Sequence, residues 1–79
     1  MSRLQKFIED QLLLAEYKYD ESVKQWTGWL PRFQGVYSQG KNIEIVRNEL
    51  AEILEEQIFI SVKDRKPIKG FSLKLSVNA

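Results

Sequence analysis

Hydrophobic residues recur at helical spacing at the start of the chain. Four apolar residues fall on one side of a helix that begins near residue 2: Leu4, Phe7, Ile8 and Ala15. Ser2 followed three residues later by Gln5 has the form of a capping box, in which the serine oxygen accepts from a first-turn amide. The pattern predicts a helix over about residues 2–14 that buries one stripe of side chains.

The next third of the chain alternates with the period of two that is typical of strands. Aromatic residues alternate with charged ones in Glu16–Glu21. Further extended segments are expected at Trp26–Leu30 and Val36–Gln39, with tight turns between them. Pro31 lacks an amide donor, so it either ends the second ladder or lies on an edge of the sheet. Gly28 either leaves room for a bulky neighbour to approach the backbone or marks a twist point of the strand. The segment predicts a three-stranded antiparallel meander.

A long amphipathic segment follows and is expected to form the core helix. Gly40 is expected to turn the chain sharply, and Asn42 is a good helix N-cap. One face of the helix collects the residues expected to be buried: Ile43, Val46, Leu50, Ile53, Leu54, Gln57 and Ile58. Ile45 and Phe59 project almost opposite that face, where a solitary helix normally carries polar groups. They are the candidates for an oligomer interface.

The end of the chain combines a basic loop with a regular alternation. Lys63–Lys69 is rich in lysine and arginine and contains a proline, which indicates a loop. In Phe71–Val77 apolar residues alternate with serine and lysine, which predicts a final strand. A right-handed crossover can return this strand to the sheet. The chain is therefore predicted to be a single α+β domain over residues 1–79, in the order α-β-β-β-α-β.

The composition limits the chemistry that the protein can perform. The sequence contains no cysteine and no histidine, which removes thiolate ligands, the commonest metal ligand and the usual general base. A nuclease would need carboxylates that converge on a metal. Asp20, Glu21 and Glu44 are the carboxylates near expected strand ends and the expected helix start. We expect no catalytic residue, no metal and no cofactor.

Length and hydropathy set two further expectations. A domain of 79 residues lies near the lower limit for a self-sufficient apolar core, so a homo-oligomer, a dimer or larger, is expected. No stretch approaches the ~20 apolar residues that a membrane span needs. The first residues also lack the basic segment followed by an apolar run that is typical of a signal peptide. A cytoplasmic protein without membrane contact is expected.

The net charge of +1 hides an uneven distribution. Residues 1–41 sum to about +1, residues 42–58 to about −4 and residues 59–79 to about +4. An acidic helix followed by a basic segment can be self-complementary within one fold. The alternative is nucleic-acid binding by the basic residues near the end of the chain, with a steep dependence on salt. Its candidate contacts are Lys63, Arg65, Lys66 and Lys69.

An ordered set of aromatic and turn residues precedes the core helix. In sequence order these residues are Trp26, Gly28, Leu30 and Pro31, then Gly35, Ser38 and Gly40, with Asp64, Pro67 and Ile68 after the helix. The set resembles the HicB-like antitoxin family, in which an aromatic-rich segment ending in proline is followed by glycine, Ser-x-Gly and a helix. The resemblance covers about residues 16–77 and implies a truncated ribonuclease H-like fold, here preceded by the helix at 2–14.

The resemblance implies a functional class and its partners. It implies inhibition of a HicA-type toxin, an mRNA-cleaving ribonuclease, by covering the active surface of the toxin. Such a contact needs area with aromatic anchors, and the candidates are Trp26, Trp29, Phe33 and Tyr37, although tryptophans in small proteins are more often core residues. The alternative is an orphan HicB-like protein with a structural or RNA-binding role. Operator binding is not expected without a C-terminal DNA-binding domain.

Overall fold

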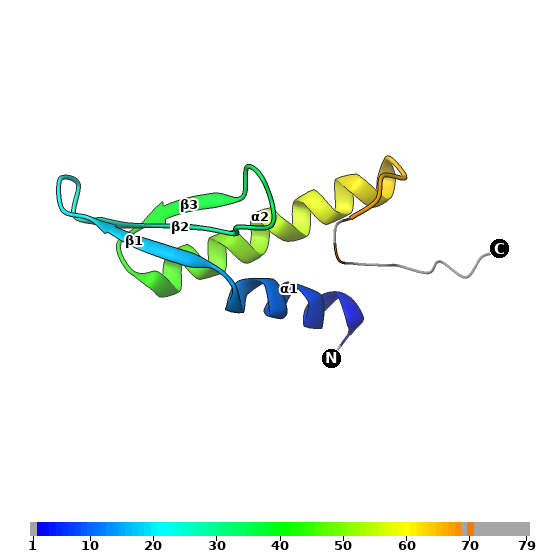
Figure 1. Cartoon of the computed structure of the whole chain (residues 1–79), viewed down its shortest axis with the longest axis horizontal. Coiled ribbons are helices and arrows are strands. Elements are labelled where there is room, and N and C mark those ends of the chain that lie inside the picture. The colour runs from blue at the N-terminus through cyan, green and yellow to red at the C-terminus, as the bar shows by residue number, and fades with distance from the viewer. Residues whose placement is uncertain (1, 69, 71–79) are drawn as a thin grey trace.

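The computed structural model describes residues 2–68 and residue 70 as a helix, three strands and a longer helix (Figure 1). In chain order the elements are α1 over Arg3–Leu13, β1 over Glu16–Asp20, β2 over Gln25–Trp29, β3 over Tyr37–Gly40 and α2 over Ile43–Lys63. This confirms the predicted α+β class and the order of its first five elements. The strand expected at Phe71–Val77 lies outside the described residues.

Local capping interactions set the limits of α1. The Ser2 hydroxyl accepts from the Gln5 amide, and the Gln5 side chain accepts from the Ser2 amide, both at 3.0 Å, which completes the predicted capping box. The helix ends at Leu13, and the Leu14 amide still donates to the carbonyl of Gln11 at 3.0 Å. Its buried stripe consists of Phe7, Ile8, Gln11 and Leu12.

The three strands form an antiparallel sheet in the order β1-β2-β3. The loop between β2 and β3 is held by its own backbone: the Leu30 amide donates to the Val36 carbonyl at 3.1 Å, and the Phe33 amide donates to the Leu30 carbonyl at 3.1 Å. Gly35 has φ +85°, a left-handed conformation that favours glycine. Pro31 lies just beyond the end of β2, as its lack of a donor predicts.

α2 is the longest element, and its C-terminal half extends beyond the sheet (Figure 1). The Asn42 side chain accepts from the Ile45 amide at 2.8 Å, which confirms the predicted N-cap. The helix continues to Lys63, so the first residue of the expected basic loop forms its last turn. Ile43 was expected to be buried and is 39% exposed, because it lies in the first turn of α2, before the buried face that begins at Val46.

The core lies where α2 meets the sheet on one side and α1 on the other. α2 contacts β2 and β3, and it packs separately against α1. The buried apolar residues come from both helices and from the β2–β3 connection: Phe7, Ile8, Leu12, Leu30, Val36, Val46, Leu50, Leu54 and Ile58. Neither described helix is long and apolar enough to cross a membrane.

Two glycines allow α2 to approach the sheet closely. A Cβ atom on Gly28 would lie 2.6 Å from Val46 Cγ1, so the space that this glycine leaves is filled by the helix. A Cβ atom on Gly40 would lie 3.0 Å from Ile45 Cγ2 and 3.3 Å from Val46 Cγ2. The prediction of a sharp turn at Gly40 is wrong, because this residue pairs within β3 and serves the close approach instead.

Candidate functional site

One face of the sheet packs on α2, and neither described helix covers the other face. Gly28 faces α2, because a side chain there would collide with Val46. Ser38, the partner of Gly28 on β3, also faces the helix, since its hydroxyl donates to the Glu49 carboxylate. Side chains alternate between the two faces along a strand. The residues that flank Gly28 and Ser38 therefore point away from α2.

We call the face that points away from α2 the open sheet face. All three strands contribute to it: Glu16, Lys18, Thr27, Trp29, Tyr37 and Gln39. Trp29 and Tyr37 are cross-strand partners, so their side chains are neighbours. Tyr37 is 66% exposed, and Trp29 is partly exposed. The two rings form an aromatic surface that a partner molecule can reach.

The other two aromatic candidates pack inward. Trp26 lies on the side of β2 that faces α2, and its ring lies 5.3 Å from that of Tyr19 at an interplanar angle of 60°. The ring of Phe33 stands edge-on to Phe7 of α1, with centroids 6.0 Å apart and an angle of 86°. Both residues are half-buried and pack against the core. The predicted set of four anchors is thus divided between a surface pair and two core aromatics.

Charges of both signs lie beside the aromatic pair. Glu16 is the cross-strand partner of Trp29, and Lys18 is the partner of Thr27. A nucleic-acid site would require a basic patch, and this face does not form one. Sequence reasoning missed Lys18, Thr27 and Gln39, because alternation along a strand does not say which face of the sheet α2 covers.

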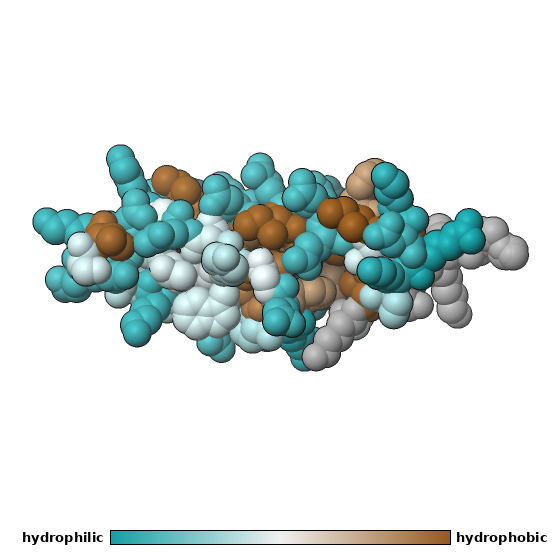
Figure 2. All heavy atoms as spheres, turned by 90° about the horizontal axis from the view of Figure 1, so that it is seen from above, coloured by the Kyte–Doolittle hydropathy of each residue, from teal (hydrophilic) through white to brown (hydrophobic). Residues whose placement is uncertain are grey.

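The two oligomer-interface candidates are exposed but distant from each other. Ile45 is 46% exposed and Phe59 is 73% exposed. They lie on α2 about 21 Å apart at 1.5 Å per residue. Figure 2 likewise shows hydrophobic side chains that reach the surface at several separate places among hydrophilic ones. Ile45 and Phe59 therefore do not contact each other.

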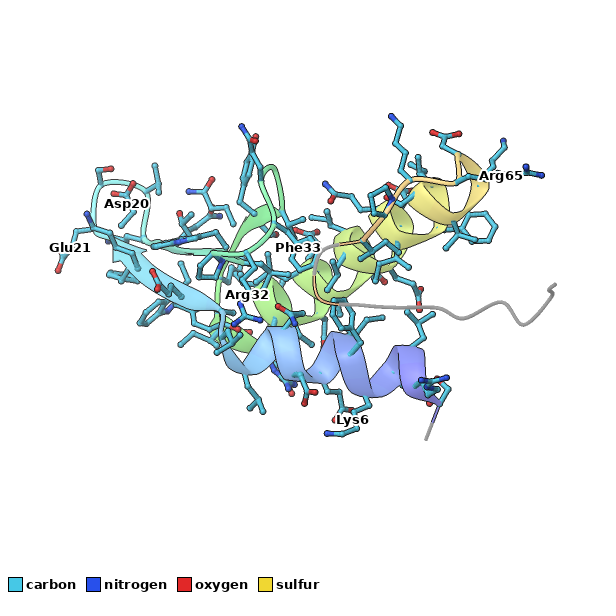
Figure 3. All side chains as sticks on the ribbon, turned by 45° about the vertical axis from the view of Figure 1, so that its right-hand side comes forward. Lys6, Asp20, Glu21, Arg32, Phe33 and Arg65 are labelled. Atoms are coloured by element: carbon cyan, nitrogen blue, oxygen red, sulfur yellow. The ribbon has the colours of Figure 1, made fainter. Side chains whose placement is uncertain are left out.

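The predicted basic contacts gather at the end of α2. Lys63 is its last residue, and Arg65 and Lys66 follow in the turn; all three are exposed. Figure 3 shows Arg65 at the opposite end of the molecule from Asp20 on the β1–β2 hairpin. Lys69 lies outside the described residues. The basic end of α2 and the open sheet face are therefore separate surfaces.

The candidate carboxylates do not converge. Asp20 and Glu21 lie at the β1–β2 hairpin (Figure 3), whereas Glu44 lies in the first turn of α2. In residues 2–68 and 70, no group of three or more histidine, cysteine, aspartate or glutamate residues could hold a metal ion. Asp20 instead closes the hairpin turn: its carboxylate accepts from the Ser22 hydroxyl at 2.6 Å and from the Ser22 amide at 3.0 Å.

These two hydrogen bonds make Asp20 a measurable reporter of the hairpin. The bond from the Ser22 hydroxyl, followed by that from the Ser22 amide, lowers the pKa of Asp20 below its ordinary value of 3.8. The hairpin is therefore favoured above that ordinary value and loses this contribution as the pH falls through the lowered pKa. Ser22→Ala is expected to raise the pKa of Asp20, measured by NMR titration. An unchanged pKa would show that the serine hydroxyl is not the cause.

Comparison with known families gives a match that spans most of the chain. A profile of the UPF0150-like family matches residues 6–69. The chain belongs to the UPF0150-like family. The matched region contains all three strands and the whole of α2. The open sheet face is therefore part of the UPF0150-like region.

Individual relatives agree with this assignment. A UPF0150 protein of Thermotoga maritima is 38% identical over 45 residues, which cover 57% of this UPF0150-like chain. The match spans about 60% of the length of that curated relative. The crystal structure of TTHA0281 from Thermus thermophilus matches with a TM-score of 0.76 and 22% identity, over 86% of this chain and 91% of that chain. This last likeness shows a shared fold.

Proposed function

We propose that this protein is a non-catalytic binding module, an antitoxin that neutralises a HicA-type, mRNA-cleaving toxin in the cytoplasm by covering its active surface. The observation that carries the proposal is the open sheet face, with Trp29 and Tyr37 side by side and accessible. The residues that resemble the HicB-like antitoxins lend support. Gly28 and Gly35 of that set stand where the fold requires glycine.

Occlusion of an active surface depends on area and on a few well-placed anchors. A stable complex typically buries about 1,200–2,000 Å² in total. Tyrosine and tryptophan near the centre of such an interface contribute most when they are held rigidly. Trp29 and Tyr37 lie on paired strands that are already ordered, so little backbone conformational entropy is lost when they bind a partner. The open sheet face therefore has the features of a preorganised docking surface.

Titration against a purified HicA-type ribonuclease from the same organism tests the proposal. Cleavage of an RNA substrate is expected to fall in proportion to the added protein and to stop at a fixed molar ratio, because occlusion is stoichiometric. Replacing Asp20, Glu21 and Glu44 by their amides is expected to leave the titration unchanged, since occlusion needs neither a metal nor proton transfer. Cleavage that continues at a large molar excess, with no complex on gel filtration, would overturn the antitoxin assignment.

The aromatic pair is expected to dominate the affinity. Trp29→Ala and Tyr37→Ala should each weaken binding to the ribonuclease by at least ~1–2 kcal/mol, or roughly 5- to 30-fold in Kd. Ile45→Ala is the control, because it removes an apolar side chain that is 46% exposed on α2, away from the open sheet face and outside the residues that line the groove beside α1. It should leave Kd unchanged.

Two checks make the affinity measurements decisive. Circular dichroism must show that Trp29→Ala folds, because Trp29 is partly buried. Isothermal titration calorimetry then gives Kd for each folded variant. Wild-type affinity in both Trp29→Ala and Tyr37→Ala would show that the toxin docks on another surface.

RNA binding by an orphan HicB-like protein is the second candidate function. It is favoured by the three exposed basic residues at the end of α2: Lys63, Arg65 and Lys66. Retention of labelled RNA at low salt that declines steeply as salt rises would support it, because phosphate contacts release counterions. No retention at low salt would remove this candidate.

A further inference from the structure

A second accessible surface lies on the side of α2 that faces away from the sheet. There α1 and the second half of α2 bound a groove of about 630 Å³, whose apolar lining is Leu4, Ile58, Phe59 and Val62. We call it the α2 groove. Phe59 stands at the groove and is 73% exposed, more than Tyr37 on the open sheet face. An apolar projection and an apolar depression therefore lie side by side on one surface.

We propose that the α2 groove is a dimer interface between two copies of this chain, packed antiparallel so that Phe59 of each copy enters the groove of the other. A two-fold interface uses the same patch on both copies, so the patch must complement itself. A projecting ring beside a groove meets that condition, because each copy supplies one projection and one depression. Both Phe59 rings then leave water, which is the main source of affinity in such a contact.

The charges around the groove determine the orientation of the two copies. Glu52, Glu55 and Glu56 line the groove, and Lys63 follows Glu56 by about two helical turns on the same side of α2. Lys6–Asp10 is the one ion pair within residues 2–68 and 70. The glutamates of the groove and Lys63 therefore do not pair with one another within one copy. Antiparallel packing sets the acidic stretch of one copy against the basic end of the other.

A second copy fits this surface better than an unrelated protein segment does. An unrelated basic segment would satisfy the glutamates, but it would leave the basic end of α2 without a partner. In the dimer, Lys63, Arg65 and Lys66 of each copy lie against the acidic groove of the other copy. The parallel arrangement would oppose like charges and is therefore disfavoured. The chain thus carries both halves of its own interface.

The α2 groove and the open sheet face are on opposite sides of the sheet–helix pair. α2 contacts the face of the sheet that carries Gly28 and Ser38, and Phe59 points away from that contact. A dimer formed through α2 therefore leaves both open sheet faces accessible. The dimer proposal can be tested without a toxin, so its outcome does not depend on whether the antitoxin proposal is right.

Light scattering after gel filtration tests the inference on the full chain. The wild type is expected to have the mass of a dimer, and Phe59→Glu is expected to have the mass of a monomer with an unchanged circular dichroism spectrum. Ile45→Glu is the control, because Ile45 is 46% exposed on the same helix but lies outside the groove. It should remain dimeric. A monomeric wild type at millimolar concentration would overturn the proposal and leave a foreign segment as the occupant.

Charge reversal tests the antiparallel orientation. The acidic-side variant E52K/E55K/E56K and the basic-side variant K63E/R65E/K66E are each expected to be monomeric, because like charges then meet across the interface. An equimolar mixture of the two is expected to form dimers, since the reversed groove of one variant meets the reversed helix end of the other. A mixture that stays monomeric, while both variants are folded by circular dichroism, would overturn the proposed orientation and with it the interface.

Discussion

Leu50→Ala is expected to lower the free energy of unfolding by about 2–5 kcal/mol. Leu50 is 0% exposed and belongs to the core cluster to which α1, the β2–β3 connection and α2 all contribute. Alanine removes buried apolar surface and leaves a cavity that rigid neighbours close only in part. A domain of 79 residues has a total stability of roughly 4–12 kcal/mol. The variant should therefore lose a large part of its stability.

Denaturant unfolding at a fixed protein concentration measures this loss. Leu13→Ala is the matched control, because it makes the same change in a helix at a residue that is 77% exposed. Its free energy of unfolding should stay within about 0.5 kcal/mol of the wild type. An unchanged unfolding midpoint in Leu50→Ala would mean that the face of α2 assigned to the core is wrong.

The parts of the fold that could be predicted from the sequence depend on short-range interactions. The capping box joins Ser2 and Gln5, and the N-cap of α2 joins Asn42 and Ile45, so each lies within one helical turn. Period-two alternation placed the three strands to within about one residue at each end. Such interactions are present in the local sequence, and they need no knowledge of the rest of the fold.

The division of the aromatic candidates could not be predicted in the same way. Trp26 and Trp29 are separated by an odd number of positions in one strand, so alternation places them on opposite faces. Alternation does not say which face α2 covers. That depends on the contact between Gly28 and Val46, which are far apart in sequence. The packing of Phe33 on Phe7 is a long-range contact of the same kind.

The α2 groove also depends on tertiary packing. A helical wheel places Phe59 away from the core face, and the structure agrees, since Phe59 is 73% exposed. The wheel also pairs Phe59 with Ile45, because it ignores distance along the helix. The groove exists because α1 contributes Leu4 beside the second half of α2. Only the helix–helix contact therefore distinguishes Phe59 from Ile45 as an interface residue.

Gly28→Ala is expected to lower the free energy of unfolding by about 1–3 kcal/mol through overpacking. The new Cβ atom would lie 2.6 Å from Val46 Cγ1 and 2.9 Å from Tyr17 Cδ1, so α2 or the sheet must shift. Val46 is 0% exposed and is held on all sides, which prevents its side chain from turning away. Thermal or denaturant unfolding measures the loss. A stability equal to that of the wild type would contradict the close packing of α2 on β2.

A double-mutant cycle with Val46→Ala identifies the cause of that loss. Val46→Ala removes the atom that the new Cβ of Gly28→Ala would meet, so the double variant should be more stable than the two separate losses predict, by about 0.5–3 kcal/mol. Gly35→Ala is the control: it should cost about 1–2 kcal/mol because its φ is +85°, while its nearest neighbour would lie 3.8 Å away at Gln57 Nε2. Strain of that kind is within the backbone, so Val46→Ala should not relieve it. If Val46→Ala coupled equally with both glycine variants, the stability lost in Gly28→Ala would also come from backbone conformation. Contact with α2 would then not be the reason that glycine is required at position 28.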